Sequence, residues 1–325
     1  MVTPDPRRYY DEAYFRRWNY ADRPLGRFSM YWFARRYYAA LVRRHAPPGG
    51  PERRLLELGC GLGHLLAQLQ DEFRCAGIDL IPSAVDHARR QAPRATVVVG
   101  DASDLTSVPG GSLAVVVALH LVEHLPDPRR SLGEVFERLE PGGLLLFATP
   151  HPDYLLRRFK DRATDAIGKD PTHVNCHPPP VWRAWAEEAG FVVIRHFGDG
   201  LWDVPYVPVM PKPLQLAVFG APALVQVLTR STFMPLALGV NQIVLAEKPG
   251  ARPRHPSRVR SAPAATTTAR ATPGRYENGP LRRRQPSGGT TASRRPLRSG
   301  ASPPPRPSWL PVGRRAARAG PVARS

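Results

Sequence analysis

Glycines at three alternate positions, Gly59, Gly61 and Gly63, interrupt the leucine-rich segment LLELGCGLGHLL. A strand that enters such a turn brings backbone N–H groups and the start of the next helix close to a ligand, because glycine carries no Cβ. A dinucleotide loop, G-x-G-x-x-G, would need a glycine where His64 or Leu66 stands, and the Gly-Lys-Ser/Thr end of a P-loop is missing. The segment therefore predicts a ligand loop of another kind.

The elements around this loop alternate between short apolar runs and stretches of helical spacing. The predicted strands are 54–58, 75–80, 95–100, 113–119, 144–149, 191–197 and 241–248, and the predicted helices are 63–73, 82–92, 128–140 and 180–190. Pro82 is expected to open a helix, and the PGG at 141–143 to end one. Strands that are apolar throughout are typical of a parallel sheet covered on both faces. We therefore predict an α/β fold with a doubly wound, mostly parallel sheet in three αβα layers.

Composition divides the chain into a cap, a main domain and a tail. Residues 1–48 carry aromatics and arginines at helical spacing and are expected to form an N-terminal helical cap, whereas 49–248 hold the main domain. Residues 249–325 contain 17 arginines and one glutamate, so they account for +16 of the formal net charge of +19. This Arg/Pro-rich tail is expected to be disordered. It is either an idle extension, the simpler interpretation, or an electrostatic arm for nucleic acid, anionic lipid or an acidic partner.

The cysteines and the first residues of the chain indicate the cellular compartment of the protein. Cys60, Cys75 and Cys176 are odd in number and widely spaced, which argues against a disulfide framework and for a reducing environment. The first residues, MVTPDPRRYYDEAYFRRW, carry charges where a signal peptide needs an apolar core. A cytoplasmic location, with membrane association as a further option, is therefore expected.

Glu57 ahead of the glycines completes the pattern E-x-G-x-G-x-G, which resembles motif I of the class I S-adenosylmethionine-dependent methyltransferases. Three later segments resemble motifs of that family in the same order: GIDLIPSAVDHAR at 77–89, GDASDLTSVPGGSLAVVVALHLVEHLPDP at 100–128 and LEPGGLLLFATP at 139–150. The likeness covers about residues 54–200, and this segment is similar to a methyltransferase domain of type 11, 12 or 23. It implies a Rossmann-like fold, S-adenosylmethionine as cofactor and methyltransferase activity.

The resemblance implies which residues hold the methionine end of the cofactor. Glu57 would offset its ammonium group or bond the loop amides. The loop residues that would face the methionine portion are Gly59, Cys60, Gly61 and Gly63. His120, which ends the fourth predicted strand, would border the sulfonium.

The nucleoside end falls to residues after the second and third predicted strands. Asp79, with Leu80 beside it, is placed to accept hydrogen bonds from both ribose hydroxyls. Asp101 is placed to accept one from the adenine amino group, and the backbone of Ala102 would lie beside the ring. Taken singly, Asp79 or Asp101 could instead be a helix-capping aspartate.

A second polar cluster follows the fifth predicted strand. Its chemistry-bearing side chains are His151, Asp153, His173, Cys176 and His177. The T-H-x-N around His173 resembles one branch of the family. A histidine suits an O–H or N–H acceptor near neutral pH, so His173 and His151 are the candidate bases. Alternatively, these groups only brace a loop against the sheet.

The segment HLVEH matches H-x-x-E-H, the inverted zinc-protease signature, through His120, Glu123 and His124. That chemistry needs both histidines on one helical face and a third ligand further on. Here His120 ends a strand, and Pro126 with Pro128 leaves no room for a helix. We therefore expect no metal site.

An apolar insertion is expected at about 201–238. Residues 213–246 hold a single charge, Arg230, but the apolar segment LQLAVFGAPALVQVLT is shorter than the roughly 20 residues that span a bilayer. The preferred interpretation is a buried insertion helix. The alternative is a hydrophobic lid or a peripheral membrane contact through 213–235, to which the basic tail could add.

These observations predict methyl transfer to oxygen or nitrogen of a small-molecule or lipid- or sugar-linked acceptor. Two rivals remain: a non-catalytic protein that binds S-adenosylmethionine for regulation, and a nucleic-acid methyltransferase that uses the basic tail. No Asn/Asp-Pro-Pro-Tyr/Phe motif of base methylation follows the fourth predicted strand, where HLVEHLPDP stands instead. No specific nucleic acid is therefore predicted as a partner.

Overall fold

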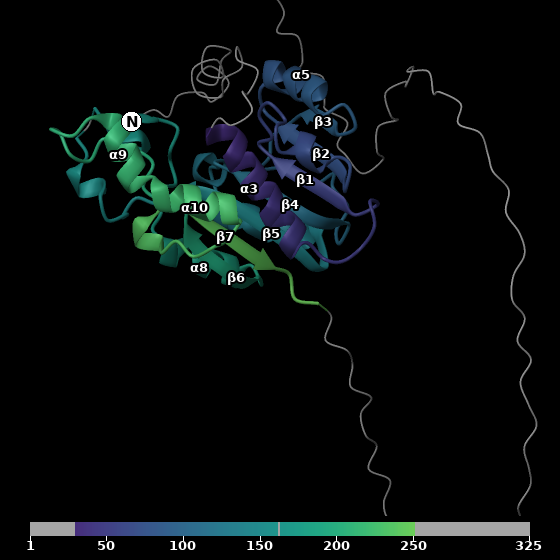
Figure 1. The fold of residues 1–325 in the computed structure, drawn as a ribbon. Helices are drawn as coiled ribbons and strands as arrows, with labels where there is room; N and C mark the ends of the chain where they lie inside the picture. The colour runs from purple at the N-terminus through teal and green to yellow at the C-terminus, as the bar shows by residue number, and fades with distance from the viewer. Residues whose placement is uncertain (1–29, 162, 251–325) are drawn as a thin grey trace, which may run out of the picture. The chain divides into compact units, whose positions relative to one another are not determined.

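The predicted sheet is present, with seven strands in the order β3-β2-β1-β4-β5-β7-β6. The computed structural model describes residues 30–161 and 163–250, and Figure 1 shows them in colour. The strands are β1 (Arg54–Leu58), β2 (Arg74–Asp79), β3 (Thr96–Val99), β4 (Leu113–Leu119), β5 (Leu139–Pro150), β6 (Val192–Gly198) and β7 (Asn241–Glu247).

Strand direction brings the ends of five strands together. β1 pairs in parallel with β2 and β4, β2 with β3, and β4 with β5. β7 runs antiparallel to both of its neighbours, β5 and β6. The mostly parallel, doubly wound sheet is thus confirmed. The ends of β1 to β5 form what we call the carboxyl edge, where such sheets bind ligands.

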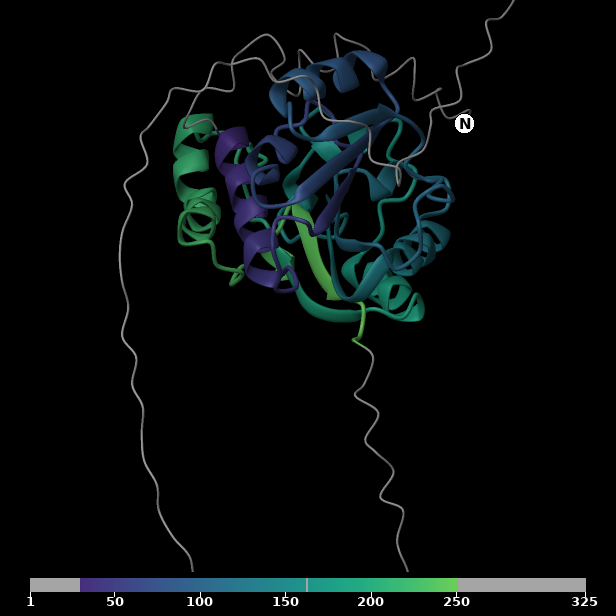
Figure 2. The same cartoon turned by 90° about the vertical axis from the view of Figure 1, so that its right-hand side faces the viewer.

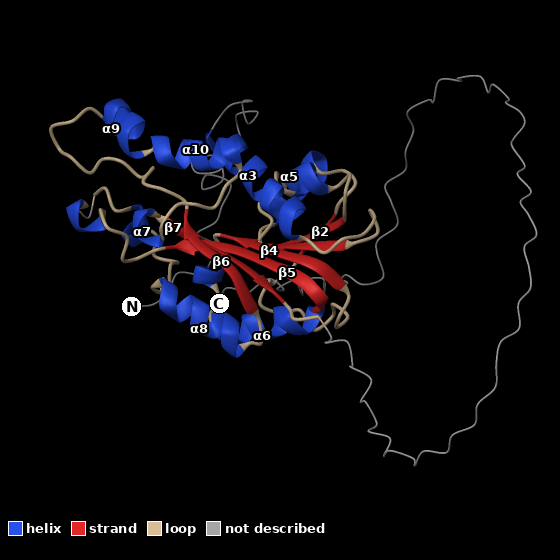
Figure 3. Ribbon diagram, turned by 60° about the horizontal axis from the view of Figure 1, so that its bottom comes forward, coloured by secondary structure: helices blue, strands red, loops and turns tan. Residues whose placement is uncertain are grey.

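Helices cover both faces of the sheet, as Figure 3 shows. One face carries α3 (Met30–His45), α4 (Leu66–Leu69), α5 (Pro82–Gln91) and α10 (Ala221–Thr229), and the other carries α6 (Pro128–Arg138) and α8 (Pro179–Glu188). Successive side chains of a strand point to opposite faces. Leu55 therefore joins the core under α3, whereas Leu56 packs with Trp182 of α8 in the second core. Both positions must be apolar, which explains the uniformly apolar strands.

Helix α3 belongs to the same packed unit as the sheet. Leu41 and Val42 of α3 are fully buried in the core against the sheet. Figure 2 shows α3 beside α10, where the Tyr37 hydroxyl donates a hydrogen bond to the Ser231 carbonyl over 2.6 Å. Of the predicted cap, residues 1–29 lie outside the described residues, and so does the predicted disordered tail from residue 251 on.

Two predicted helix boundaries are wrong. The helix predicted at 63–73 is reduced to α4, because tight turns take up the remaining residues on both sides. The PGG at 141–143 does not end a helix, since α6 already ends at Arg138 and β5 begins at Leu139. Leu139 pairs with Leu113 of β4, so strand pairing extends through the turn-forming residues.

The insertion predicted at about 201–238 lies between β6 and β7, and its two ends are joined. Asn241 donates from its backbone N–H and from its side-chain amide to the Asp199 carboxylate, over 2.8 and 2.7 Å. Nearby, a Cβ on Gly239 would lie 2.4 Å from the Cα of Gly198. Chain entry and exit therefore meet at one place beside the sheet.

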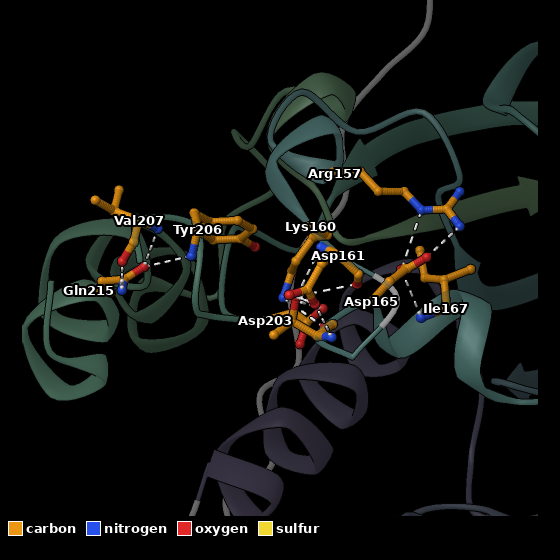
Figure 4. A network of polar contacts seen from close by, with 10 residues as sticks. Arg157, Lys160, Asp161, Asp165, Ile167, Asp203, Tyr206, Val207 and Gln215 are labelled. Atoms are coloured by element: carbon orange, nitrogen blue, oxygen red, sulfur yellow. Dashed lines mark hydrogen bonds and ion pairs between the residues drawn. The ribbon is translucent and has the colours of Figure 1, made fainter. Parts of the chain in front are cut away.

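The insertion holds two short helices, α9 (Lys212–Phe219) and α10, rather than the buried helix that we predicted. Figure 4 shows how the segment is held. Gln215 of α9 accepts from the N–H groups of Tyr206 and Val207, and the buried Lys160 pairs with Asp203 over 3.0 Å. Polar contacts thus anchor an apolar segment. Among the described residues, no helix combines the length and apolar character that crossing a bilayer requires.

Candidate functional site

The glycine loop joins β1 to α4 at the carboxyl edge in a backbone conformation that favours glycine. Gly59, Gly61 and Gly63 have φ angles of 62°, 50° and 77°. A Cβ on Gly63 would lie 2.8 Å from the Cα of Ala88, and a Cβ on Gly59 would lie 2.9 Å from the Leu121 side chain. Both the left-handed conformation and close packing therefore require these residues.

Asp79 at the end of β2 ties this loop to the next one. Its carboxylate accepts from the Gly61 N–H over 2.7 Å and from the Ile81 N–H over 3.0 Å. Burial raises the pKa of Asp79, although the amides of Ile81, Gly61 and Leu80 oppose that shift. Each carboxylate oxygen offers two lone-pair positions. The three amides take three of these four positions, which leaves one for a ligand hydroxyl, and the ribose role of Asp79 stays a prediction.

Glu57 in β1 is a buried carboxyl whose Oε2 has no hydrogen-bond partner among the described residues. Burial raises its pKa to about 8; Arg35 lowers that pKa, Asp79 raises it, and the Leu66 amide lowers it. A buried carboxyl oxygen that lacks a partner destabilises the fold unless a ligand compensates it. The residue therefore fits a cationic group of a ligand, such as the ammonium of S-adenosylmethionine.

The other residues predicted for the cofactor differ in how they could contribute. The Cys60 side chain is buried, and its N–H donates to the Ile78 carbonyl. Only the backbone of Cys60 could therefore contribute to the loop. Leu80 packs in a small cluster beside Ile81, and the Ala102 side chain is buried in the core. Asp101 is exposed and accepts from the N–H and hydroxyl of Ser103 over 2.8 and 2.7 Å. The adenine-binding role of Asp101 stays a prediction, because closing this turn is by itself a sufficient structural role for the carboxylate.

His120 follows β4 with a φ of 54°, uncommon for a residue other than glycine. Its side chain is 40% exposed. Burial nevertheless lowers its pKa to about 3, and the charge of Arg35 lowers it further. Because it follows β4, His120 lies at the carboxyl edge, where the sulfonium is expected.

Three further polar side chains meet beside His120. Glu123 and His124 lie in the short 3-10 helix η1 (Val122–His124), and His173 comes from the T-H-x-N segment. The rings of His124 and His173 are 4.9 Å apart between centroids. Burial raises the pKa of Glu123 to about 8 and lowers that of His124 to about 4. The structure thus assembles a polar cluster from segments far apart in sequence.

Backbone contacts explain why the T-H-x-N segment reaches this place. The N–H groups of Val174 and Asn175 donate to the Glu123 carbonyl over 3.1 and 2.9 Å. The Asn175 side-chain amide donates to the Leu125 carbonyl over 2.6 Å. The segment is therefore clamped onto η1, which positions His173 beside it.

The remaining residues of the second predicted cluster lie elsewhere. His151 is buried, and its Nδ1 lies 3.0 Å from the Leu236 carbonyl at the foot of the insertion. His177 packs edge-on against Trp185, and Cys176 packs with the small core of the insertion. Asp153 lines a shallow depression on the 152–165 segment. Of the two candidate bases, only His173 lies in the cluster beside His120.

Arg35 of α3 is a charged residue near the site that sequence reasoning missed. Its positive charge lowers the pKa of Glu57 and that of His120, so it lies within electrostatic reach of both. The sequence offers only arginines at helical spacing in this region, which do not indicate which one turns toward the carboxyl edge. Helix packing on the sheet determines that choice.

Comparison with known proteins agrees with this geometry. Residues 5–196 match the family described as "Methyltransferase domain". A probable S-adenosylmethionine-dependent methyltransferase of Mycolicibacterium smegmatis is 36% identical over 124 residues, or 37% of this chain and 46% of the relative. The 23S rRNA (guanine(748)-N(1))-methyltransferase of Streptomyces fradiae is 34% identical over 133 residues, or 40% of this chain and 43% of the relative.

A solved structure supports the fold. In the Haloferax volcanii complex of the Trm112 activator with a methyltransferase, the matched chain has a TM-score of 0.50 and 18% identity, over 74% of this chain and 98% of that one. The chain spans under half the length of the curated relatives named above. The family match itself covers more than half of the chain, which therefore belongs to the S-adenosylmethionine-dependent methyltransferase family.

Proposed function

We propose that the protein transfers a methyl group from S-adenosylmethionine to oxygen or nitrogen of a small-molecule or lipid- or sugar-linked acceptor. The observation that carries the proposal is Glu57, a buried carboxyl without a compensating partner at Oε2, beside a glycine loop tied to Asp79. A cationic amino acid joined to a ribose matches this pair of carboxylates. The reducing environment of the cytoplasm suits the free cysteines Cys60, Cys75 and Cys176.

The residues of the carboxyl edge mainly bind and orient. When bound, S-adenosylmethionine supplies a methyl carbon whose bond to sulfur breaks as an acceptor lone pair forms the new bond, and sulfur keeps the electron pair. Glu57 would hold the amino-acid end, Asp79 would hold the ribose, and His120 would border the reacting centre. Such alignment accounts for much of the rate in a displacement between bound partners. A base is needed only for an acceptor that must lose a proton, and His173 is the candidate.

The insertion supports an acceptor linked to lipid, because its helices bury polar side chains and expose apolar ones. Gln215 of α9 and Gln226 of α10 are fully buried and bonded to backbone groups. We call the exposed large apolar residues of the insertion its apolar surface; they are Trp202, Val209, Leu214, Leu216, Val218, Leu224, Val225, Leu228 and Phe233. Helices of a water-facing surface normally show the opposite arrangement. Exposed apolar residues in this number on one segment indicate an interaction site.

The charges next to the apolar surface indicate the chemistry of its partner. No acidic residue occurs between Asp203 and Glu247, whereas Lys212 and Arg230 are exposed. Apolar side chains bordered by basic ones match an anionic lipid surface. We therefore propose that the apolar surface contacts such a membrane and brings the carboxyl edge to acceptors held there.

Calorimetric titration with S-adenosylmethionine tests the cofactor half of the proposal. The full chain should bind, and Asp79→Ala and Gly61→Val should each weaken binding at least about tenfold through lost charged hydrogen bonds or loop strain. Asp86→Ala, which removes an exposed carboxylate of α5, is the control that should bind normally. No binding by the wild type would overturn the proposal.

Transfer of a labelled methyl group to fractionated cell extract tests the acceptor half. Label in a small-molecule or lipid fraction supports the proposal. Label in RNA would instead favour an activity like that in the name of the Streptomyces fradiae relative. Tight cofactor binding without any transfer would favour a regulatory protein.

Co-sedimentation with vesicles tests the membrane contact. The protein should bind vesicles that contain phosphatidylglycerol, and the double substitution Val225→Gln/Leu228→Gln should reduce the bound fraction severalfold. Val192→Gln is the matched control, because Val192 is 57% exposed but lies on β6, outside the apolar surface. Equal binding by all variants would contradict the assignment.

A further inference from the structure

We infer that Glu123, His124 and His173 form a binding site for a divalent transition-metal cation. Each residue offers one ligand atom, and the three atoms lie within 4.8 Å of one another. Metal–ligand bonds of about 2.0–2.2 Å place the ligand atoms of one ion roughly 3–4 Å apart. Glu123 Oε1 and His124 Nε2 are already 3.9 Å apart. Small side-chain movements would therefore close the three groups around one ion.

Both histidines are oriented as metal ligands usually are. Nδ1 of His124 lies 3.0 Å from the Thr172 carbonyl, and Nδ1 of His173 lies 2.9 Å from the Ile167 carbonyl. A carbonyl only accepts, so each Nδ1 must carry the proton and donate it. In the neutral ring this leaves the lone pair on Nε2. Metal-binding histidines commonly show this second hydrogen bond, which fixes the tautomer and the ring direction.

The third group is a carboxyl that the fold buries without satisfying it. Glu123 is fully buried, and neither of its side-chain oxygens makes a hydrogen bond of normal geometry among the described residues, although the buried Thr149 hydroxyl lies close enough to lower its pKa. Its neighbours include the Nδ1 of His120, 3.8 Å from Oε1. A buried acceptor pair of this kind is costly unless something occupies it. A cation held jointly with two imidazoles would satisfy it.

The donor set and its place indicate the ion and its use. Two imidazole nitrogens and one carboxylate oxygen suit Zn²⁺ or Mn²⁺ better than Ca²⁺ or Mg²⁺, which prefer oxygen alone. Three protein ligands leave coordination positions open. Because His120 lies at the same edge, the open coordination positions would face the acceptor. The ion would then polarise the oxygen or nitrogen of the acceptor. This use rests on the proposed function, whereas the binding of the ion does not.

The H-x-x-E-H pattern alone does not predict this site. His120 and His124 do not share one helical face, since His120 follows a strand and His124 lies in η1. The structure supplies His173 instead, through the clamp between Glu123 and the T-H-x-N segment. That contact between distant segments is not visible in the spacing of H-x-x-E-H.

Metal titration of the full chain, stripped with chelator and dialysed, tests the inference. Zn²⁺ by calorimetry and Mn²⁺ by electron paramagnetic resonance should each show one site per chain. Glu123→Gln and His173→Gln should weaken the affinity at least about tenfold. His177→Gln is the control in the same segment, because its ring packs against Trp185 instead.

Cofactor titration of the same proteins separates the two proposals. Glu123→Gln is nearly isosteric and should retain S-adenosylmethionine binding and its melting temperature. Cofactor binding without stoichiometric metal binding would overturn the metal site alone, and so would equal metal affinity in all variants. Metal binding without cofactor binding would overturn the proposed function and leave the metal site standing.

Discussion

The two halves of the carboxyl edge are built in different ways. The half that we propose to hold the cofactor comes mainly from one stretch of chain, from Glu57 to Ser103, in which Asp79 bonds the glycine loop and Asp101 closes the turn after β3; His120 adds to it from the end of β4. The acceptor half joins η1, the T-H-x-N segment and the insertion, which lie far apart in sequence. The first half depends on local backbone geometry, whereas the second depends on long-range contacts. They should therefore respond differently to substitution.

The largest effect is expected in the glycine loop. Gly63→Ala places a Cβ against the Ala88 backbone at a φ of 77°, so it should lower the free energy of unfolding by about 3 kcal/mol or more. Gly111→Ala is the control, because Gly111 has a φ of 61° with no atom near the new Cβ, and it should cost only about 1 kcal/mol. Chemical denaturation measures both. Equal losses would mean that packing does not explain the glycine at 63.

A smaller and local effect is expected in the insertion. Gln226→Leu leaves the Gly198 carbonyl and the Met234 N–H without their partner and should cost about 2–3 kcal/mol. Hydrogen exchange should rise in residues 199–240 while S-adenosylmethionine affinity stays within about twofold. Leu228→Gln on the same helix should change stability by less than about 0.5 kcal/mol, since Leu228 is 57% exposed. Loss of cofactor binding in Gln226→Leu would show that the halves are coupled.

The pH dependence of cofactor binding should come from Glu57. Its pKa is raised from 4.5 to about 8, so the free protein holds a proton there at pH 6 to 7.5. Binding of a cationic ligand favours the carboxylate and releases that proton. The affinity should therefore rise by up to about tenfold, or 1.4 kcal/mol, per pH unit in this range. Glu57→Gln should abolish the slope, and an unchanged slope would rule out Glu57 as the titrating group.

The same shift has a consequence for stability. Because the folded state holds the Glu57 proton more tightly than the unfolded state, this group favours folding fully below pH 4.5. That contribution is lost as pH rises toward 8. Thermal melts of wild type and Glu57→Gln, compared across this range without cofactor, should converge at low pH and diverge at high pH.

The smallest effect is expected at Asp101. Asp101→Ala should weaken S-adenosylmethionine binding about fivefold, the loss of one hydrogen bond of roughly 1 kcal/mol. Ser103→Ala removes one partner of Asp101 and should change the affinity by less than about twofold. If Asp101→Ala changes stability but not affinity, the turn with Ser103 is its whole role.

The contrast between local geometry and long-range contacts also explains which features could be predicted from the sequence. β1 and β4 match the predicted ranges 54–58 and 113–119, because burial on both faces demands apolar residues throughout. Asp79 could be singled out from sequence because it ends a predicted strand. The cluster of Glu123, His124 and His173 could not be found, because it depends on the docking of one segment onto another. The insertion was misjudged because apolar character alone does not tell a buried helix from an exposed one.

The joined ends of the insertion make it a cassette. The hydrogen bonds between Asp199 and Asn241 hold the two ends of the insertion together, so the segment between them is a closed loop. Doubling the length of such a loop costs only about 0.6 kcal/mol in closure entropy. Related proteins could therefore exchange this segment, and with it the surface presented to an acceptor, while the glycine loop and the sheet stay as they are.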